Sequence, residues 1–374
     1  MLIKYLHLNS SRNRLGFLVL LVLSNLILCL TRITDWAPLS ADQIWFYNTA
    51  KESLFHGGFP LVYGLRSSIY WLHHGAFWLY VLIPALPITN FHPLTASFLT
   101  VFLNLFNIPL VYYFSGLLFG KKQAVISAFL VSFFNYSIVL SRLGNHISLI
   151  PLLWLIFALA LVKKRYFLSG LFLGFLYQTH LFAFVYWPVA ILYLLYKKAP
   201  LSGFITGSVI GIIPFIITGP IQTFGIVVWL MKYLLTLRNF SGASNSQMLI
   251  FLIPAMVVVS VLLSRLEKRF LAILGVIYLV FNVHYLISRN FTPWSIFYSI
   301  NYGQKLRISR QILQQSRLSS PEIIVPGGLP DASNSYSEPY KYLVWWLQRR
   351  GGKPEGTYSK FVVDENKLSV KVLE

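Results

Sequence analysis

The sequence predicts an all-α polytopic membrane protein. We expect about nine transmembrane helices, a long first outer loop containing two interfacial helices, and a small C-terminal α+β extracytoplasmic domain. Three observations predict this fold: few charged residues, a regular spacing of basic connections, and a sharp rise in charge density after about residue 290. Of the 374 residues, 56% are hydrophobic and 11% are charged, and the mean hydropathy is +0.64. Because a soluble domain carries roughly 25% charged residues, most of this surface is expected to contact lipid.

The formal net charge of +20 has a different meaning here from the one it has in a soluble protein. In a soluble protein it would suggest nucleic-acid binding. The basic residues of this chain instead form short clusters between apolar runs, as cytoplasmic loops do, so we expect no nucleic-acid partner. The single cysteine, Cys29, lies inside the first apolar run and can form no internal disulfide. We expect it to be a small core residue.

Runs of about 20 apolar residues are long enough to cross a bilayer. The chain contains nine such candidate spans, and several of them are short. They lie at roughly 15–32, 94–119, 123–141, 146–162, 166–181, 182–196, 201–218, 247–264 and 270–287. Glycines at four-residue spacing in 201–218, and Gly170 with Gly174, predict close helix packing.

The orientation follows from the placement of lysine and arginine in short loops. Every second connection is basic, which predicts a multi-pass plasma (inner) membrane protein with a cytoplasmic N-terminus and an extracytoplasmic C-terminus. Residues 221–237 test this count, because a further span there would move the next basic cluster outside. We prefer an amphipathic helix at the outer interface for this segment. The basic clusters are Lys4/Arg12/Arg14, Lys121/Lys122, Lys163/Lys164/Arg165, Lys197/Lys198 and Arg265/Lys268/Arg269.

Two regions lie outside the spans and predict a division into a transmembrane domain, 1–289, and a small domain, 290–374. The loop 33–92 is much longer than a typical connection, and long ordered loops are usually functional. We expect helices at about 40–56 and 69–83 in it. In the tail we expect helices at 299–316 and 337–350, and strands at 322–326, 359–363 and 368–373.

Carboxylates are scarce before residue 290: only Asp35, Asp42, Glu52 and Glu267 are present. Glu267 lies in a cytoplasmic basic loop, where a local ion pair explains it. Asp42 is the preferred catalytic candidate, because Ser40-Ala41-Asp42-Gln43 fits a capping box that begins a helix. The alternative is that Asp42 only complements the helix dipole. Asp35 is a second candidate, and Glu52 fits a solvated pair with Lys51.

Other polar residues gather at the predicted outer ends of the spans. Ionisable groups near membrane depth are costly and usually functional, although singly each is more often an interfacial or hydrogen-bonded residue. The turn after the third span holds Arg142, Asn145 and His146, and the turn after the fifth holds Gln178 and His180. The long loop adds Arg66, His73 and His74.

Four segments in order resemble a known family. They are SADQIWFYNTAKESLFHGGFPLVYG, IYWLHHGAFWLYVLIP, FFNYSIVLSRLGNHISLIPLLWLIFALAL and YFLSGLFLGFLYQTHLFAFVYWPVAILYLL. Over roughly residues 10–200 the chain resembles the membrane-embedded C-superfamily glycosyltransferases. Within it, the protein O-mannosyltransferase and aminoarabinose-transferase branch is most similar. The resemblance rests on order, spacing and topology rather than on one specific motif.

The resemblance implies roles for individual residues. Asp42 matches the family's catalytic carboxylate, Arg142 and Asn145 match its polar turn, and His180 matches a position that faces the donor phosphate. Arg66 joins Arg142 and His180 as a phosphate-binding candidate. The family often has Asp-Glu where this chain has Asp42-Gln43, so a divalent metal is doubtful. No metal ligands are assigned, and no other cofactor is expected.

The predicted reaction is sugar transfer from a polyprenyl-phosphate donor to a lipid, glycan or protein acceptor. Arginine suits bidentate phosphate contacts, and one carboxylate near the acceptor hydroxyl can remove its proton. Direct displacement inverts the anomeric carbon, whereas a covalent intermediate needs two carboxylates. A transporter or lipid flippase is the alternative, although such proteins usually carry mid-membrane charges and repeats. An inactive scaffold is a third reading.

Overall fold

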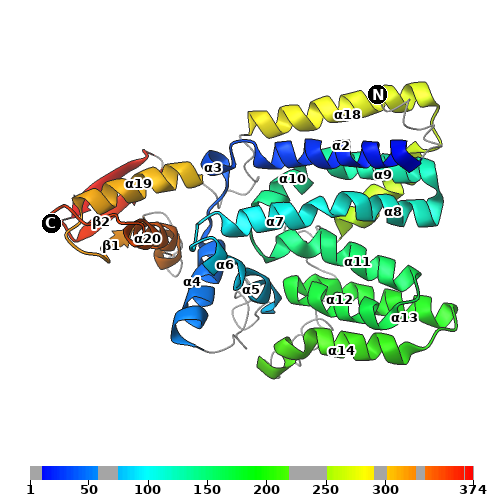
Figure 1. Cartoon of the computed structure of the whole chain (residues 1–374), viewed down its shortest axis with the longest axis horizontal. Helices are drawn as coiled ribbons and strands as arrows, with labels where there is room; N and C mark the ends of the chain where they lie inside the picture. Colours follow the sequence, from blue (N-terminus) through cyan, green and yellow to red (C-terminus); the bar gives the residue numbers. More distant parts are fainter. Residues whose placement is uncertain are drawn as a thin grey trace, which may run out of the picture.

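A computed structural model describes residues 11–57, 75–218, 251–289, 301–325, 333–365 and 367–373. The described chain is mostly helical. A bundle of apolar helices forms one part, and a small three-stranded sheet with two helices forms the other (Figure 1). The bundle comprises α2 (Ser11–Leu30), α7 (Thr95–Leu105), α8 (Asn107–Phe119), α9 (Lys121–Phe133), α10 (Asn135–Arg142), η1 (His146–Leu149), α11 (Ile150–Val162), α12 (Tyr166–Thr179), η2 (Leu181–Val185), α13 (Tyr186–Tyr196), α14 (Leu201–Thr218), α17 (Leu252–Leu263) and α18 (Lys268–Ser288).

Each described candidate span coincides with helix, but the lengths differ from the expectation. Three described stretches are long and apolar enough to cross a membrane: Asn13–Leu30, Thr95–Phe119 and Arg269–Ser288. The pair α9–α10 is a fourth if it is counted as one span bent by 54°. The other apolar helices are shorter, so the nine-span count stays a prediction. The segment 221–237 lies outside the described residues.

The bend between α9 and α10 has a polar cause. Phe134 is extended, which breaks the helix. The amide of Asn135 donates instead to Oδ1 of Asn282 on α18, at 2.9 Å. A break in an apolar helix is tolerated when a neighbouring helix satisfies the freed backbone groups. Because of this bend, α10 and the turn that follows it run in a different direction from α9.

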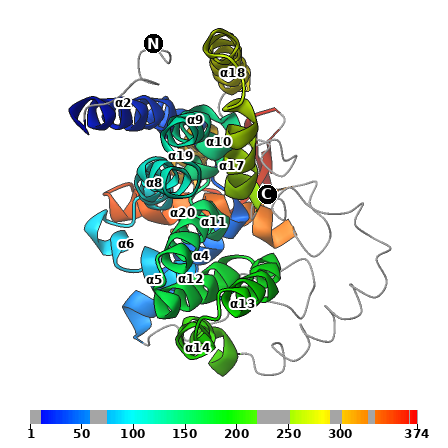
Figure 2. The same cartoon turned by 90° about the vertical axis from the view of Figure 1, so that its right-hand side faces the viewer.

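The bundle has a layered packing that runs from α2 and α18 at one edge to α14 at the other (Figure 2). Buried hydroxyl groups join its inner helices: Ser127 on α9 contacts Ser115 of α8 at 2.9 Å and Ser260 of α17 at 2.7 Å. The outer face of α18 is apolar and exposed, with Val276 and Val280 each 61% exposed. Apolar outer faces of this kind suit a lipid environment.

Glycines bring α12 and α14 into backbone contact. A Cβ added at Gly170 would lie 2.0 Å from the carbonyl oxygen of Phe204, and one at Gly207 would lie 2.0 Å from that of Phe167. Gly174 and Gly211 meet in the same way. The predicted close packing is confirmed, and the two glycine series are partners of each other.

The basic connections gather at one end of the bundle. Figure 1 shows that the links α8–α9, α11–α12, α13–α14 and α17–α18 all lie at the end farthest from the C-terminal sheet. These links carry the basic clusters Lys121/Lys122, Lys163/Lys164/Arg165, Lys197/Lys198 and Arg265/Lys268/Arg269. The long loop and the C-terminal elements lie at the opposite end. This arrangement is the one that alternating basic loops predict, while the assignment of cytoplasm and exterior stays a prediction.

The described part of the long loop contains α3 (Ile33–Trp36), α4 (Ala41–His56), α5 (Phe77–Leu82) and α6 (Ala85–Ile88). The first expected helix, 40–56, is confirmed by α4. The second helix is expected at 69–83. Within the described residues it begins at Phe77, and Gly75 and Ala76 before it are not helical. Residues 58–74 lie outside the described part.

The C-terminal elements agree with the predicted order. They are α19 (Tyr302–Gln315), β1 (Glu322–Ile324), α20 (Ser333–Arg349), β2 (Lys360–Asp364) and β3 (Ser369–Leu373). Strand β2 is central, parallel to β1 and antiparallel to β3. Its Phe361 and Val363 are fully buried and pack with Ile312 of α19 and Val344 of α20. The proposed domain boundary at 289/290 stays a prediction.

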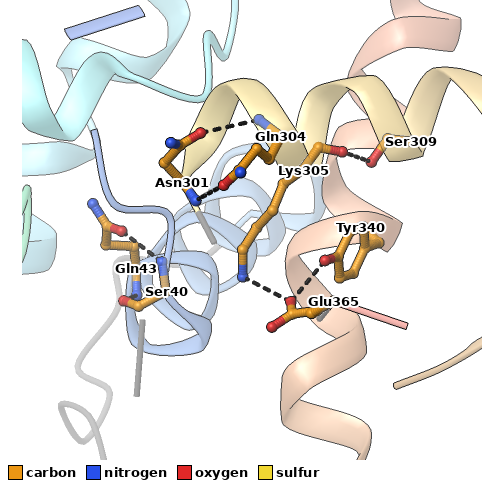
Figure 3. Close-up of polar contacts among 8 residues, drawn as sticks. All are labelled: Ser40, Gln43, Asn301, Gln304, Lys305, Ser309, Tyr340 and Glu365. Atoms are coloured by element: carbon orange, nitrogen blue, oxygen red, sulfur yellow. Dashed lines mark hydrogen bonds and ion pairs between the residues drawn. The ribbon is translucent and has the colours of Figure 1, made fainter. Parts of the chain in front are cut away.

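A buried polar cluster joins α19, α20 and the chain after β2 (Figure 3). Nζ of Lys305 lies 3.4 Å from Oε1 of Glu365, and the Tyr340 hydroxyl donates to the same oxygen at 2.7 Å. Removing one partner of a buried ion pair costs about 3–5 kcal/mol. This cluster therefore fixes how the two helices meet the sheet.

Candidate active site

A capping box begins α4, as the sequence predicts. The hydroxyl of Ser40 accepts from the amide of Gln43 at 3.2 Å, and Oε1 of Gln43 accepts from the amide of Ser40 at 2.7 Å. A second box, Asn301 with Gln304, begins α19 close by (Figure 3). The amide of Tyr302 donates to the carbonyl of Ala37 at 2.9 Å. The C-terminal elements therefore brace the chain that enters α4.

The first turn of α4 lies against the turn that follows α10. Nε2 of Gln43 donates to the carbonyl of Leu143. One turn further along α4, the ring of Phe46 packs on His146 with centroids 5.4 Å apart. Gly144, which follows Leu143 in this turn, has a φ of +62°. A Cβ added there would lie 2.6 Å from the amide nitrogen of Ser97. The structure thus brings Asp42 beside the turn carrying Arg142, Asn145 and His146.

The carboxylate of Asp42, in the first turn of α4, is crowded by surrounding protein. The Asp42 side chain is exposed to solvent, yet surrounding protein raises the pKa of its carboxyl from 3.8 through burial. Solvent therefore reaches the group, although neighbouring protein has removed part of its hydration. Within the described residues it has no ion pair or hydrogen bond. A dipole-complementing role alone would stabilise the charged form instead.

Gln43 makes a two-carboxylate site at this position unfavourable. Its amide group donates to the Leu143 carbonyl while its oxygen accepts from Ser40. An ionised glutamate has no donor for that carbonyl. Among the described residues, no group of three His, Cys, Asp or Glu side chains is arranged to hold a metal ion. At this position the residues do not fit a two-carboxylate metal site, because Gln43 supplies no second acidic ligand beside Asp42.

Arg142 lies at the end of α10 and is fully buried. Its Nη1 donates to the carbonyls of Cys29 and Thr31, each at 2.9 Å. These carbonyls belong to the C-terminal end of α2, which a cation stabilises. The structure therefore shows Arg142 as an anchor between α2 and α10, and its role in phosphate binding stays a prediction.

Arg142→Lys separates these two roles. The substitution keeps the charge but loses the planar guanidinium fork. We expect turnover and donor affinity to fall substantially, and thermal stability to fall because two buried carbonyls lose a shared donor. Measurement of Tm beside donor KM and kcat checks this. Unchanged donor kinetics with a lowered Tm would contradict a phosphate contact and leave only the anchor.

The other turn residues are buried and have structural partners. Asn145 Oδ1 accepts from the Ser148 hydroxyl at 3.3 Å, and His146 packs on Phe46. At the end of α12, Nε2 of Gln178 donates to the carbonyl of Gly211 at 2.6 Å. Nδ1 of His180 accepts from the amide of Phe182 at 3.3 Å, which places its proton on Nε2 when the ring is neutral.

The remaining candidates divide into two groups. Asp35 is bound in an exposed ion pair, with Oδ2 at 3.2 Å from Nη2 of Arg32, so it is a weaker candidate base than Asp42. Glu52 pairs with His56 at 2.7 Å and lies 3.9 Å from Lys51, as a solvated surface residue would. Three candidates lie outside the described residues: Arg66, His73 and His74.

Sequence reasoning missed the residues that hold α4 in place. The Tyr47 hydroxyl accepts from the amide of Ala96 at 2.7 Å and donates to the carbonyl of Pro93 at 2.9 Å. On α20, Oε2 of Glu338 accepts from Nδ2 of Asn48 at 3.2 Å. Nζ of Lys51 lies 4.8 Å from the centre of the Trp345 ring. Their apolar and aromatic spacing is ordinary for a packed helix, so no sequence signal distinguishes them.

No family model matches the chain, and no curated protein sequence matches it significantly. Among solved structures, it is similar to ArnT from Cupriavidus metallidurans bound to undecaprenyl phosphate. The TM-score is 0.58, with 12% identity over 94% of both chains. The chain therefore shares its overall fold with ArnT.

Weaker similarity links the chain to the Archaeoglobus fulgidus oligosaccharyltransferase. One structure, tethered to an acceptor peptide, gives a TM-score of 0.42 at 13% identity over 92% of this chain. Another, in complex with an inhibitory peptide and a dolichol-phosphate, gives 0.40 at 14% identity. This chain spans about half the length of those proteins, 47% in both cases.

Proposed function

We propose that the chain is a glycosyltransferase that moves a sugar from a polyprenyl-phosphate donor to a hydroxyl acceptor, with Asp42 as general base. The observation that supports this most is the carboxylate of Asp42, which is reachable from solvent, crowded by protein and without a partner among the described residues. A base needs a free lone pair and a pKa raised toward the working pH. Asp42 combines both properties.

The setting of Asp42 suits a lipid-linked donor. Helix α4, whose first turn carries Asp42, lies at the end of the bundle opposite the basic connections (Figure 1). On the proposed orientation this end is the outer face of the plasma membrane. Apolar helix faces beside it would carry the polyprenyl tail. ArnT was solved bound to undecaprenyl phosphate, and a ligand of the same class fits this proposal.

The proposed reaction inverts the anomeric centre. Asp42 takes the proton of the acceptor hydroxyl as its oxygen attacks the anomeric carbon, and the polyprenyl phosphate leaves with the bonding electron pair. Retention through a glycosyl-enzyme needs two carboxyl groups about 5–5.5 Å apart. The other loop carboxylates in the described part, Asp35 and Glu52, are held in ion pairs. One carboxylate therefore favours single displacement.

The pH dependence of turnover tests this proposal. A base acts only when it is ionised, and burial raises the pKa of Asp42 above 3.8. We therefore expect kcat/KM to fall as the pH drops through that raised pKa, at a higher pH than for an ordinary aspartate. Release of polyprenyl phosphate from synthetic short-chain donors, measured by mass spectrometry with a panel of acceptors, checks this. No release with any donor or acceptor, from correctly inserted protein, would contradict the proposed function.

A further inference from the structure

A solvent-open cavity lies in the C-terminal elements, between α19 and the end of α20. Its volume is about 490 Å³, within the range of roughly 300–1,000 Å³ typical of small-molecule sites. Its apolar wall comes from Leu313, Trp346 and Leu347. The polar lining consists of Arg310, Gln314, Arg350, Lys353 and Glu355.

The turn after α20 shapes this cavity. Gly351, with a φ of +94°, donates to the carbonyl of Gln348 at 2.9 Å, and Gly352 donates to that of Leu347 at 3.0 Å. This pair of bonds is a Schellman motif, which ends the helix and turns the chain back. A Cβ on Gly352 would lie 2.9 Å from Cδ2 of Leu313. The close approach brings the end of α20 and Lys353 over α19.

The cations that line the cavity differ from three lysines of these elements that are held in ion pairs. Lys305 pairs with Glu365, Lys341 with Glu338, and Lys360 with Glu322. Within the described chain, none of the cavity's own charged side chains forms an ion pair. Three cations and one carboxylate give the cavity a net charge of +2.

From this lining we infer that the cavity is a binding site for a phosphate monoester, held between Arg310 and Arg350 and separate from the Asp42 site. A phosphate monoester carries about −1.5 to −2 charges at pH 7, which matches the net charge of the lining. The planar guanidinium groups bind phosphate oxygens in pairs. Gln314 adds an amide donor for a neighbouring hydroxyl.

Arg350 also acts on residues outside the cavity. The guanidinium of Arg350 lies 5.3 Å from the ring of Trp346, which in turn packs on His92 at 5.1 Å. Burial, and then the charge of Arg350, lower the pKa of His92. The backbone carbonyl of His92 lies 3.4 Å from the hydroxyl of Tyr47 on α4, which donates to it. The cavity is thus attached to the helix that carries Asp42.

Binding of a sugar phosphate to the full-length protein in phosphatidylcholine nanodiscs tests the inference. We expect glucose 6-phosphate to bind by calorimetry and glucose to give no heat. Arg310→Gln/Arg350→Gln should weaken glucose 6-phosphate about tenfold or more, because charge-assisted hydrogen bonds are lost. Arg307→Gln is the matched control, since Arg307 is exposed on the same helix but does not line the cavity. It should bind as the parent does.

Further arms keep the test decisive. Lys353→Gln, on the turn after α20, should weaken binding even if the double variant folds poorly. Asp42→Asn should bind glucose 6-phosphate normally, which separates this site from the proposed transferase. Competition by phosphatidic acid in the nanodisc would assign the phosphate to a lipid headgroup, and no competition would assign it to a soluble ligand. Absence of binding by the parent, or equal binding by Arg310→Gln/Arg350→Gln, would overturn the inference.

Discussion

Asp42→Asn is expected to lower sugar transfer by about 10²–10⁴-fold, the usual contribution of a general base. Asparagine keeps the size of the side chain and its place in the first turn of α4, but it cannot accept the proton. Donor binding should change little, because no proton has moved in the ground state. Single-turnover release of polyprenyl phosphate, with donor affinity measured in parallel, gives the result.

The same variant should be at least as stable as the parent at neutral pH. Folding raises the pKa of the Asp42 carboxyl above its unfolded-state pKa of 3.8. The stability that the protonated group contributes is therefore fully present below pH 3.8, and it is lost as the pH rises through the folded-state pKa. Ionised Asp42 therefore costs stability at pH 7, and asparagine removes that cost. A helix-dipole role predicts the reverse, a loss of about 0.3–1 kcal/mol. Thermal unfolding across this pH range separates the two.

Glu52→Gln is the matched control for Asp42→Asn. Glu52 lies on the same helix, is exposed and pairs with His56, so its loss should leave transfer near the parent level. A fully active, correctly inserted Asp42→Asn protein would sink the assignment of the base. Asp35 would then be examined next through Asp35→Asn.

Gly207→Ala is expected to be strongly destabilising for a substitution that adds a single methyl group. The new Cβ would lie 2.0 Å from the carbonyl oxygen of Phe167, a backbone atom of α12. The two helices must then separate, and overpacking of this kind costs about 1–3 kcal/mol or more. We expect a clearly lowered Tm in detergent. We also expect weaker transfer, because Gln178 at the end of α12 bonds to Gly211 of α14.

Gly203→Ala provides the comparison. Gly203 lies one helical turn before Gly207 on α14, but its nearest neighbour, the amide of Phe167, is 3.6 Å from the added Cβ. That distance is ordinary van der Waals contact, so the Tm should remain near that of the parent. Equal Tm values for Gly203→Ala and Gly207→Ala would show that the backbone approach of α12 and α14 contributes little to stability.

The local elements of this protein were predictable from the sequence. Apolar run length located the described helices, and the capping box Ser40-Gln43 located the start of α4. Alternating apolar residues located β2, whose Phe361 and Val363 face the core. These signals work because helix starts and strand faces depend on residues a few positions apart. The scarcity of carboxylates reduced the candidate bases in the outer loop to Asp35, Asp42 and Glu52, and the capping box favoured Asp42 among them.

Contacts between distant segments were decided by the tertiary structure. Gln43 meets Leu143 across 100 residues, Arg142 meets Cys29 across 113, and Asn48 meets Glu338 across 290. Nothing in the local pattern specifies these partners, because a buried polar group bonds to whichever backbone or side chain the packing brings to it. The sequence assigned Arg142 to phosphate binding from its chemistry and its match to the family's polar turn, while the fold shows it holding the end of α2. In the same way, two glycine series predicted close packing, but only the fold made them partners.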